Sequence, residues 1–504
     1  MVQPHLWGKI YFNPYLIMKK TFTKLFSTGL LIGLTFIGFA VKAQTTSLNN
    51  TGNAPAAAPV VTSNAGSVAP YAAPQPNVQP SSTTAKSTEK KTSADPVDTS
   101  WHPQRRVWGY AFGDYYYDAH ADNDIVSSTG LPEGGAGALS KRGGETNYSG
   151  VPTYRNAFQF RRIYLGYDYE ITKKFKAELL LASEPTANVS TVGTSTVQNS
   201  DNLADNKMAF YIKNINLRAR DLWTGTDFVI GELSTPGFAL NEPGTNAPTS
   251  LSETTWSYRS VERTITDFHK NNSYDVGAAL QGTFDPSTKN FGYVLMMGDN
   301  TQASLLSAAS ANTGFYKIFY GDIWGKFANN HIYADIYADY AKTAPATAQI
   351  PGQDHNMFKL FVAYLSKPIT IGAEAYTQNL ASGVENTTTK LPEDATVHAL
   401  SLWVRGPIVP TLNYFLRFDT YNPDTDFNTS DSYSANTNYS SYNPTVKEQF
   451  WTGGLDFNPT KNVHFEPNFW LVDYTDQRTP STAGYVLPDH TLVYRLTFFF
   501  TFGK

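Results

Sequence analysis

The sequence predicts an all-β fold: a transmembrane antiparallel β-barrel of about 16 strands. Three observations predict it. The chain starts with an export signal, its side chains alternate with a period of two from about residue 105 onward, and its connections alternate between long and short. Aromatic residues make up 14% of the chain and hydrophobic residues 41%. This composition suits a thin apolar outer skin better than a deep core.

Residues 1–43 are predicted to be an over-called start followed by a signal peptide. Lys19 and Lys20 open a positive region, an apolar run follows over 25–41, and small residues precede a cleavage point, so the mature chain begins near Gln44. A single transmembrane anchor is the alternative, but serine, threonine and glycine interrupt the run. Because no later segment is apolar for long enough, no transmembrane helix is expected in the mature chain.

Residues 44–104 are predicted to be a disordered periplasmic linker rich in Pro, Ala, Ser and Thr. Such a segment buries too little apolar surface to offset the entropy of ordering it. Its proline spacing favours extended conformers. A plain spacer is the simplest interpretation, and binding to peptidoglycan or to a partner is the alternative.

The barrel is expected over residues 105–504. In its last segment Leu492, Leu496 and Phe500 share one face of a strand, while Thr491 and Arg495 share the other. The same alternation marks sixteen segments: about 106–118, 156–169, 174–184, 207–218, 226–235, 273–284, 291–300, 314–327, 331–342, 355–366, 369–380, 395–405, 411–422, 446–457, 462–474 and 491–502.

The connections support a barrel with tight turns at one end and long loops at the other. After odd-numbered segments they span about 12 to 37 residues, and after even-numbered ones about two to seven. Breakers such as Lys367-Pro368, Gly406-Pro407 and Asn458-Pro459 mark the short turns. A large soluble β-protein is the alternative, but aromatic residues gather near segment ends as they do at membrane interfaces. In lipid every backbone group must be paired, so the sheet is expected to close.

Several motifs resemble the phosphate-selective porin family and related Gram-negative porins. In order, they are Gly231-Glu-Leu-Ser-Thr-Pro-Gly-Phe238, Trp256-Ser-Tyr-Arg-Ser-Val-Glu-Arg263, Asp267, Asn272-Ser-Tyr-Asp-Val-Gly277, and Phe291-Gly-Tyr-Val294 through Gly298-Asp-Asn300. Phe160-Arg-Arg-Ile-Tyr-Leu-Gly166 and Gly454-Leu-Asp-Phe-Asn-Pro459 are similar in kind. The resemblance implies sixteen strands, a trimer, and a third loop folded into the lumen. The chain departs from the family at three points. Glu follows Gly231 where the family usually has Gln, and the sequence ends Phe502-Gly-Lys504 instead of at an aromatic residue. It also has no dense arginine ladder.

The third long loop, about 236–272, is therefore the expected constriction. Its candidate residues are Glu253, Trp256, Tyr258, Arg259, Glu262, Arg263, Asp267, His269 and Lys270. Arginine suits oxyanions because its guanidinium donates hydrogen bonds in pairs. An ordinary extracellular loop is the alternative.

A sixteen-strand barrel leaves a water-filled lumen lined by the polar face of each strand. The residues expected there are Arg162, Asp168, Lys174, Lys176, Glu178, Asp335, Asp339, Glu374, Arg417, Asp419 and Arg495. Charges of both signs would set ion selectivity. The alternative for each is an ion pair within the wall.

Other kinds of function have weaker support. The net charge of −4, without basic blocks, argues against nucleic acid as a partner. The absence of cysteine excludes disulfides, thiolate metal sites and a cysteine nucleophile. Asp424-x-Asp426-x-Asn428 resembles the start of a calcium loop but lacks its glycine and final acid. His398 and Ser401 fall on opposite strand faces, so a serine esterase is not expected. No metal and no cofactor are predicted.

The sequence thus predicts a porin of the bacterial outer membrane that allows passive diffusion of small hydrophilic solutes or ions. Within this porin function, selective uptake of oxyanions such as phosphate is one possibility. The expected partners are outer-membrane lipid and lipopolysaccharide, the solutes themselves, and further copies of the chain in a homotrimer. The alternative is a surface binding or adhesion barrel whose long extracellular loops carry the function.

Overall fold

A computed structural model describes residues 102–120, 153–184, 188–192, 195–199, 210–237, 251–269, 273–299, 316–345, 352–386, 388–428, 431–432, 444–477 and 489–503. The predicted signal and linker, residues 1–104, lie almost wholly outside these ranges. Their assignment stays a prediction.

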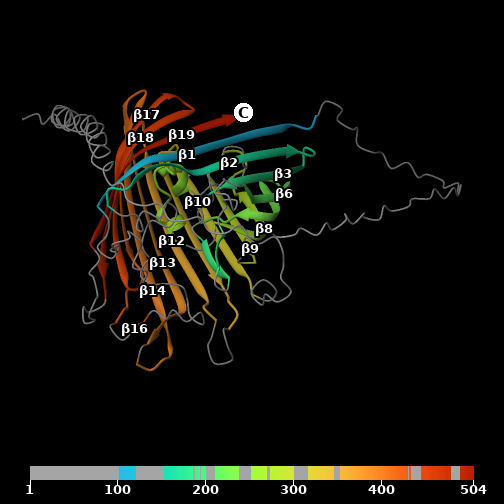
Figure 1. The fold of residues 1–504 in the computed structure, drawn as a ribbon. Helices are drawn as coiled ribbons and strands as arrows, with labels where there is room; N and C mark the ends of the chain where they lie inside the picture. The colour runs from blue at the N-terminus through green and yellow to red at the C-terminus, as the bar shows by residue number, and fades with distance from the viewer. Residues whose placement is uncertain are drawn as a thin grey trace, which may run out of the picture. The chain divides into compact units, whose positions relative to one another are not determined.

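The described chain folds into one closed antiparallel β-barrel of sixteen long strands, which we call the wall (Figure 1). They are β1 (Arg105–His120), β2 (Asn156–Glu170), β3 (Phe175–Ser183), β6 (Tyr211–Trp223), β7 (Thr226–Ser234), β8 (Tyr274–Thr283), β9 (Phe291–Gly298), β10 (Ile318–Phe327), β11 (Ile332–Ala341), β12 (His355–Leu365), β13 (Thr370–Asn386), β14 (Pro392–Val409), β15 (Leu412–Asn422), β17 (Val446–Thr460), β18 (Val463–Asp476) and β19 (His490–Gly503).

The described residues form three further short strands outside the wall's sixteen. The strands β4 (Asn188–Val192) and β5 (Ser195–Asn199) pair with each other, and the two-residue β16 (Asp431–Ser432) pairs with the end of β13. None of the helices in the described part of the chain is long and apolar enough to cross a membrane.

All sixteen predicted strands are confirmed, but two predicted turns and one predicted loop are wrong. Gly406-Pro407 lies within β14, opposite Tyr414 and Asn413, at an irregularity in the ladder where proline is tolerated. Asn458-Pro459 likewise lies at the end of β17. The long loop expected after residue 380 is instead an extension of β13 and β14, paired through Val384 and Glu393.

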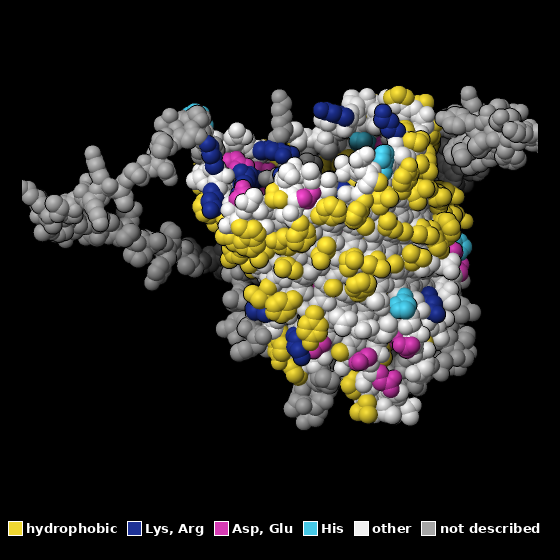
Figure 2. Space-filling view, turned by 180° about the vertical axis from the view of Figure 1, so that it is seen from behind, with side chains coloured by type: hydrophobic (Ala, Val, Ile, Leu, Met, Phe, Trp, Pro, Cys, Tyr) yellow, Lys and Arg dark blue, Asp and Glu magenta, His cyan; other side chains and the backbone are white. Residues whose placement is uncertain are grey.

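The two faces of the wall differ as the alternation predicts. On β12, Phe358, Leu360 and Val362 are exposed on the outer face, whereas Lys359 and Phe361 are buried on the lumen face. Figure 2 shows apolar side chains spread over the middle of the outer face on the side displayed. The alternation in the sequence therefore produces an apolar outer surface, the outer skin, and a lumen lined by polar and aromatic side chains.

The wall closes where the first strand meets the last. Strands β1 and β19 pair from Trp108 opposite Gly503 to His120 opposite Leu492. Across this seam Thr497 Oγ1 donates to Asp114 Oδ1 at 2.7 Å, between residues 383 positions apart in sequence. Every strand of the wall consequently has a neighbour on both sides, as a membrane-spanning sheet requires.

A β-bulge changes the side-chain pattern of β2. The ladder between β1 and β2 shifts register between Phe112 and Gly113, which are opposite Arg162 and Phe160. The extra residue is Arg161, so strict alternation breaks and both Arg161 and Arg162 are buried on the lumen face. The bulge thus directs the side chains of two consecutive arginines into the barrel.

Candidate functional site

We call the connection between β7 and β8 the inner loop (residues 235–273), and its described residues, 235–237, 251–269 and 273, lie inside the lumen. It contains α2 (Leu251–Trp256) and α3 (Ile265–Phe268). The α2 helix packs against β11, β12 and β13. Trp256 is fully buried and makes edge contacts with Trp403 and Phe415 of the wall. Apolar packing of this kind holds the loop against the lumen face.

Four arginines of the wall hold the inner loop by its backbone. The guanidinium of Arg405 donates to Thr255 O at 2.6 Å, and that of Arg495 donates to Val261 O at 3.0 Å. Arg161 and Arg417 donate in the same way to the carbonyls of Ser260 and Arg263. Charged donors make the stronger hydrogen bonds, and buried ones are costly to leave unpaired. These arginines, from β2, β14, β15 and β19, act as anchors of the loop.

Wall carboxylates anchor the loop from the acceptor side. Ser260 Oγ donates to both oxygens of Glu466, at 2.9 and 2.7 Å. The amide of Thr266 donates to Glu374 Oε1 at 3.2 Å. His269 Nε2 lies 3.0 Å from Glu448 Oε2. The described part of the loop is thus held at several points, by strands on several sides of the lumen.

Two more of the predicted constriction residues, Tyr258 and Glu262, help to hold the loop, and His269 makes a second contact. Tyr258 OH donates to Asp456 Oδ2 at 3.4 Å. Burial raises the pKa of Tyr258, and the neighbouring Asp456 raises it further. Trp470 Nε1 donates to Glu262 Oε2 at 2.9 Å, and His269 stacks on Tyr421 with ring centroids 3.6 Å apart. Lys270, the last predicted member, lies outside the described residues.

Arg259 sits between two carboxylates of its own loop. Its Nη1 lies 2.9 Å from Glu253 Oε1 and 2.6 Å from Asp267 Oδ2. Burial lowers the pKa of Arg259, but Asp267 and Glu253 outweigh burial and hold that pKa above its ordinary value. The guanidinium of Arg263 lies over the ring of Phe268. Burial lowers the pKa of Arg263 by more than the neighbouring Asp267 raises it. Both pKa values start high enough for the guanidinium groups to stay charged.

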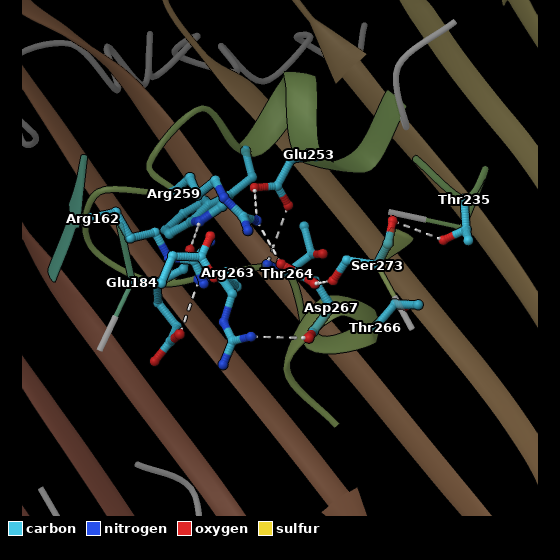
Figure 3. Close-up of polar contacts among 12 residues, drawn as sticks. Arg162, Glu184, Thr235, Glu253, Arg259, Arg263, Thr264, Thr266, Asp267 and Ser273 are labelled. Carbon is cyan, nitrogen blue, oxygen red and sulfur yellow. Dashed lines mark hydrogen bonds and ion pairs between the residues drawn. The ribbon is translucent and has the colours of Figure 1, made fainter. Parts of the chain in front are cut away.

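Opposite these groups, the wall contributes a second set of charges (Figure 3). Glu184, just after β3, lies 3.2 Å from Arg162 Nη1 and forms a close ion pair with Lys213 of β6. Arg162 and Lys213 are near enough to Arg259 to interact with it electrostatically. We call the whole set the constriction cluster: Arg162, Glu184, Lys213, Glu253, Arg259, Arg263 and Asp267. It contains four cations and three carboxylates.

The other predicted lining residues face the lumen, with one exception. Asp168, Lys176, Glu178, Asp335, Asp339, Glu374, Arg417, Asp419 and Arg495 are all buried on the lumen face. Lys174 differs, because it lies in the exposed turn before β3 rather than on a strand. Several form ion pairs within the wall, such as Lys176 with Glu178 at 2.9 Å and Lys359 with Asp335 at 3.1 Å. Their influence on selectivity stays a prediction.

Sequence reasoning missed several charged residues of the lumen, among them Arg161, Glu184, Lys213 and Arg405. Strict alternation placed Arg161 on the lipid face, and only the bulge turns it inward. A second register shift, between Leu180 and Leu181, does the same for Lys213. The adjacent arginines 161 and 162 were the available signal, since a charge on the lipid face is costly.

Comparison with solved structures finds similarity to outer-membrane channels and porins. The chain is similar to the outer membrane channel DcaP of Acinetobacter baumannii, at 12% identity over 79% of this chain and 97% of that one, with a TM-score of 0.47. It is also similar to an anion-selective porin from Comamonas acidovorans, at 11% identity over 80% and 100% of the two chains and a TM-score of 0.44. A third is OmpF of Salmonella typhi in complex with daunomycin, at 10% identity over 79% and 97% and a TM-score of 0.46.

No protein-family model and no curated protein matches the chain. The solved structures named above do not single out the phosphate-selective family that the motifs resemble. The sixteen-strand wall and the inner loop come from the described structure itself and do not depend on these likenesses.

Proposed function

We propose that the protein is a porin of the Gram-negative outer membrane through which small hydrophilic solutes and ions diffuse passively. The observation that carries this proposal is the inner loop, anchored across the lumen of a barrel with an apolar outer skin. Such a barrel is stable in lipid because its backbone is fully paired. A loop fixed inside the lumen narrows a wide pore to a defined passage.

The passage we propose runs past the constriction cluster. Its four cations and three carboxylates leave a net positive charge, which favours anions. Oxyanions such as phosphate fit guanidinium donors especially well. Two carboxylates, Glu253 and Asp267, hold Arg259 alone. Arg162 and Lys213 share the single carboxylate of Glu184, so together they keep a net positive charge. We therefore propose Arg162, Lys213 and Arg263 as the groups that meet a passing anion.

The assembly and orientation follow from the same proposal. The long-loop end faces the cell exterior and the short turns face the periplasm, as in bacterial barrels generally. We propose a homotrimer, as the resemblance to porins implies. Light scattering of the detergent-solubilised protein tests this directly, and a monomeric mass would contradict it.

Single-channel recording in a planar lipid bilayer tests the function. Stable stepwise currents are expected, and in a potassium chloride gradient the sign of the reversal potential should indicate anion preference. Arg162→Ala and Lys213→Ala should shift the reversal potential towards cation preference, whereas Lys174→Ala, in the exposed turn, should not. Phosphate added at constant ionic strength should reduce the chloride current.

Two contrary outcomes distinguish the porin function from the role of the constriction cluster. A folded protein without conductance would contradict the porin function and favour a binding role for the long loops. Conductance with cation preference would leave the porin function standing and contradict the assignment of the constriction cluster.

A further inference from the structure

Three potential metal ligands meet where the barrel closes. His120 is the last residue of β1, and Asp489 and His490 lie at the start of β19. All three side chains are half-exposed at the long-loop end of the wall. We call them the seam cluster. They lie apart from the constriction cluster, on the joint between the first and last strands.

A β-bulge puts both histidines on the same face. Asp118 is opposite Val493 but His120 is opposite Leu492, so β1 contains one extra residue at this point. Without that residue His120 would share the lumen face with Asp118. With it, His120 shares the outer face with Leu492 and therefore with His490, two residues away.

The ligand atoms are close together. His120 Nε2 lies 2.8 Å from Asp489 Oδ2, and His490 Nδ1 lies 3.6 Å from the same oxygen. The two imidazole rings stack with centroids 4.0 Å apart. One ligand atom from each residue lies within 4.8 Å of those of the other two. Two atoms bound to one ion at about 2.1 Å each can be at most about 4.2 Å apart, so small side-chain rotations suffice.

We propose that the seam cluster binds a divalent transition-metal ion, with zinc as the reference ion. Two imidazole nitrogens and one carboxylate oxygen are ligands that zinc, nickel and copper accept, and they are a poor set for calcium or magnesium. Three protein ligands leave a coordination position for water. Asp473 is opposite His490 on the same face and adds negative charge beside the site.

A hydrogen bond between His120 and Asp489 alone explains the arrangement less well, because it gives His490 no part. The contact between His120 and Asp489 has hydrogen-bond length, but the 3.6 Å between His490 and Asp489 is too long for one. Two stacked imidazolium cations would also repel each other. An ion bound by neutral rings uses all three groups at once.

The bound ion would link the first strand of the wall to the last. A ligand that binds only the folded barrel stabilises it in proportion to the logarithm of its concentration over Kd. Zinc should therefore raise the unfolding temperature of the folded protein. Because the site lies at the rim, this effect is independent of whether the pore conducts.

Zinc titration of the full chain tests the proposal. The titration uses protein without a histidine tag. A chromogenic chelator competes with the protein for zinc, so its absorbance reports the amount of zinc that the protein binds. We expect one tightly bound zinc per chain. His120→Ala, His490→Ala and Asp489→Asn should each weaken binding by at least about 100-fold. His331→Ala, in an exposed turn between β10 and β11, is the matched control and should bind zinc normally.

Two further measurements keep the test decisive. The altered gel mobility of a closed barrel before heating shows whether each variant folds. If a variant does not fold, the visible absorption of cobalt bound to the wild-type protein still reports whether imidazole ligands surround the ion. Absence of zinc binding by the wild-type chain, or equal binding by the folded His120→Ala and His490→Ala variants, would overturn the proposal.

Discussion

At the scale of single residues, Glu184 controls the charge of the constriction. It pairs with Arg162 and Lys213 from two different strands. Burial raises the pKa of Glu184, but these two cations outweigh burial, so the pKa falls below its ordinary value. The carboxylate therefore stays ionised and offsets part of the positive charge around it.

Glu184→Gln should make the channel more anion-selective. The substitution removes one negative charge and keeps a hydrogen-bonding side chain of nearly the same size. We expect the ratio of anion to cation permeability to rise severalfold, measured from the reversal potential in a salt gradient. Glu170→Gln, in the wall pair with Arg220 outside the constriction cluster, serves as the control. A shift towards cations would contradict our assignment of the cluster.

Asp285 shows a second residue-scale effect, in the turn between β8 and β9. Its carboxylate accepts hydrogen bonds from Thr288 and from the amides of Asn290 and Phe291. The hydrogen bond from Thr288, with help from the two amides, lowers the pKa of Asp285 below its ordinary value. A lowered folded-state pKa gives stability that is present above the unfolded pKa and is lost as the pH falls through the folded value.

Asp285→Ala should therefore destabilise the barrel at pH 6 but hardly at all in strong acid. The measurement is the urea midpoint of unfolding for wild type and variant at both pH values. Lys367→Ala, in the turn before β13, is the control and should behave alike at both. An equal loss at both pH values would show that the charge of Asp285 does not matter.

At the scale of elements, the inner loop is defined by its anchors. Arg417 and Arg495 are each held in the wall, by Asp419 and Asn468, and each reaches a loop carbonyl. The sequence suggests a selectivity role for both arginines, but their guanidinium groups are used to hold the loop.

Arg417→Met together with Arg495→Met should loosen the loop. Methionine keeps much of the side-chain volume but cannot donate to the carbonyls of Arg263 and Val261. We expect larger and noisier single-channel currents, because the passage becomes wider and less fixed. Arg220→Met removes a wall arginine paired only with Glu170 among the described contacts, and its currents should match the wild type. Unchanged currents in the double variant would mean that apolar packing alone fixes the loop.

The sequence predicts the strands far better than it predicts this loop. A period-two pattern follows from local geometry, so all sixteen segments could be located from the chain alone. The contacts of the loop depend on which strands lie across the lumen. Ser260 meets Glu466, 206 residues away, and no local pattern contains that information. Bulges cause some of the remaining errors, since a single extra residue turned Arg161 inward.

At the scale of the whole molecule, the outer skin determines where the barrel is stable. Leu360 lies near the middle of β12 with 48% of its surface exposed, and Tyr364 lies near the strand's end on the same face. The two positions sample different depths of one lipid-facing strand.

Leu360→Arg should reduce folding into lipid vesicles much more than Tyr364→Arg. A charge at the bilayer midplane costs about 2–4 kcal/mol, and one near the interface about 0–1 kcal/mol. Folded yield, read from the gel mobility of unheated samples, measures the difference. Equal yields would contradict a membrane-embedded wall. In detergent micelles, which adapt to the protein, the difference between the two variants should shrink.

The hydrogen bond from Thr497 to Asp114 joins residues near opposite ends of the barrel sequence. The first strand of the barrel, β1, thus lacks its second neighbour until β19, the last strand, has been made. Until then an unfinished sheet would present two open edges to any neighbouring strand, including those of other copies. Closure is therefore the natural last step of assembly, and it requires all sixteen strands of the wall to be present. A chain cut off before β19 should remain a substrate for chaperones and proteases rather than mature into a smaller barrel.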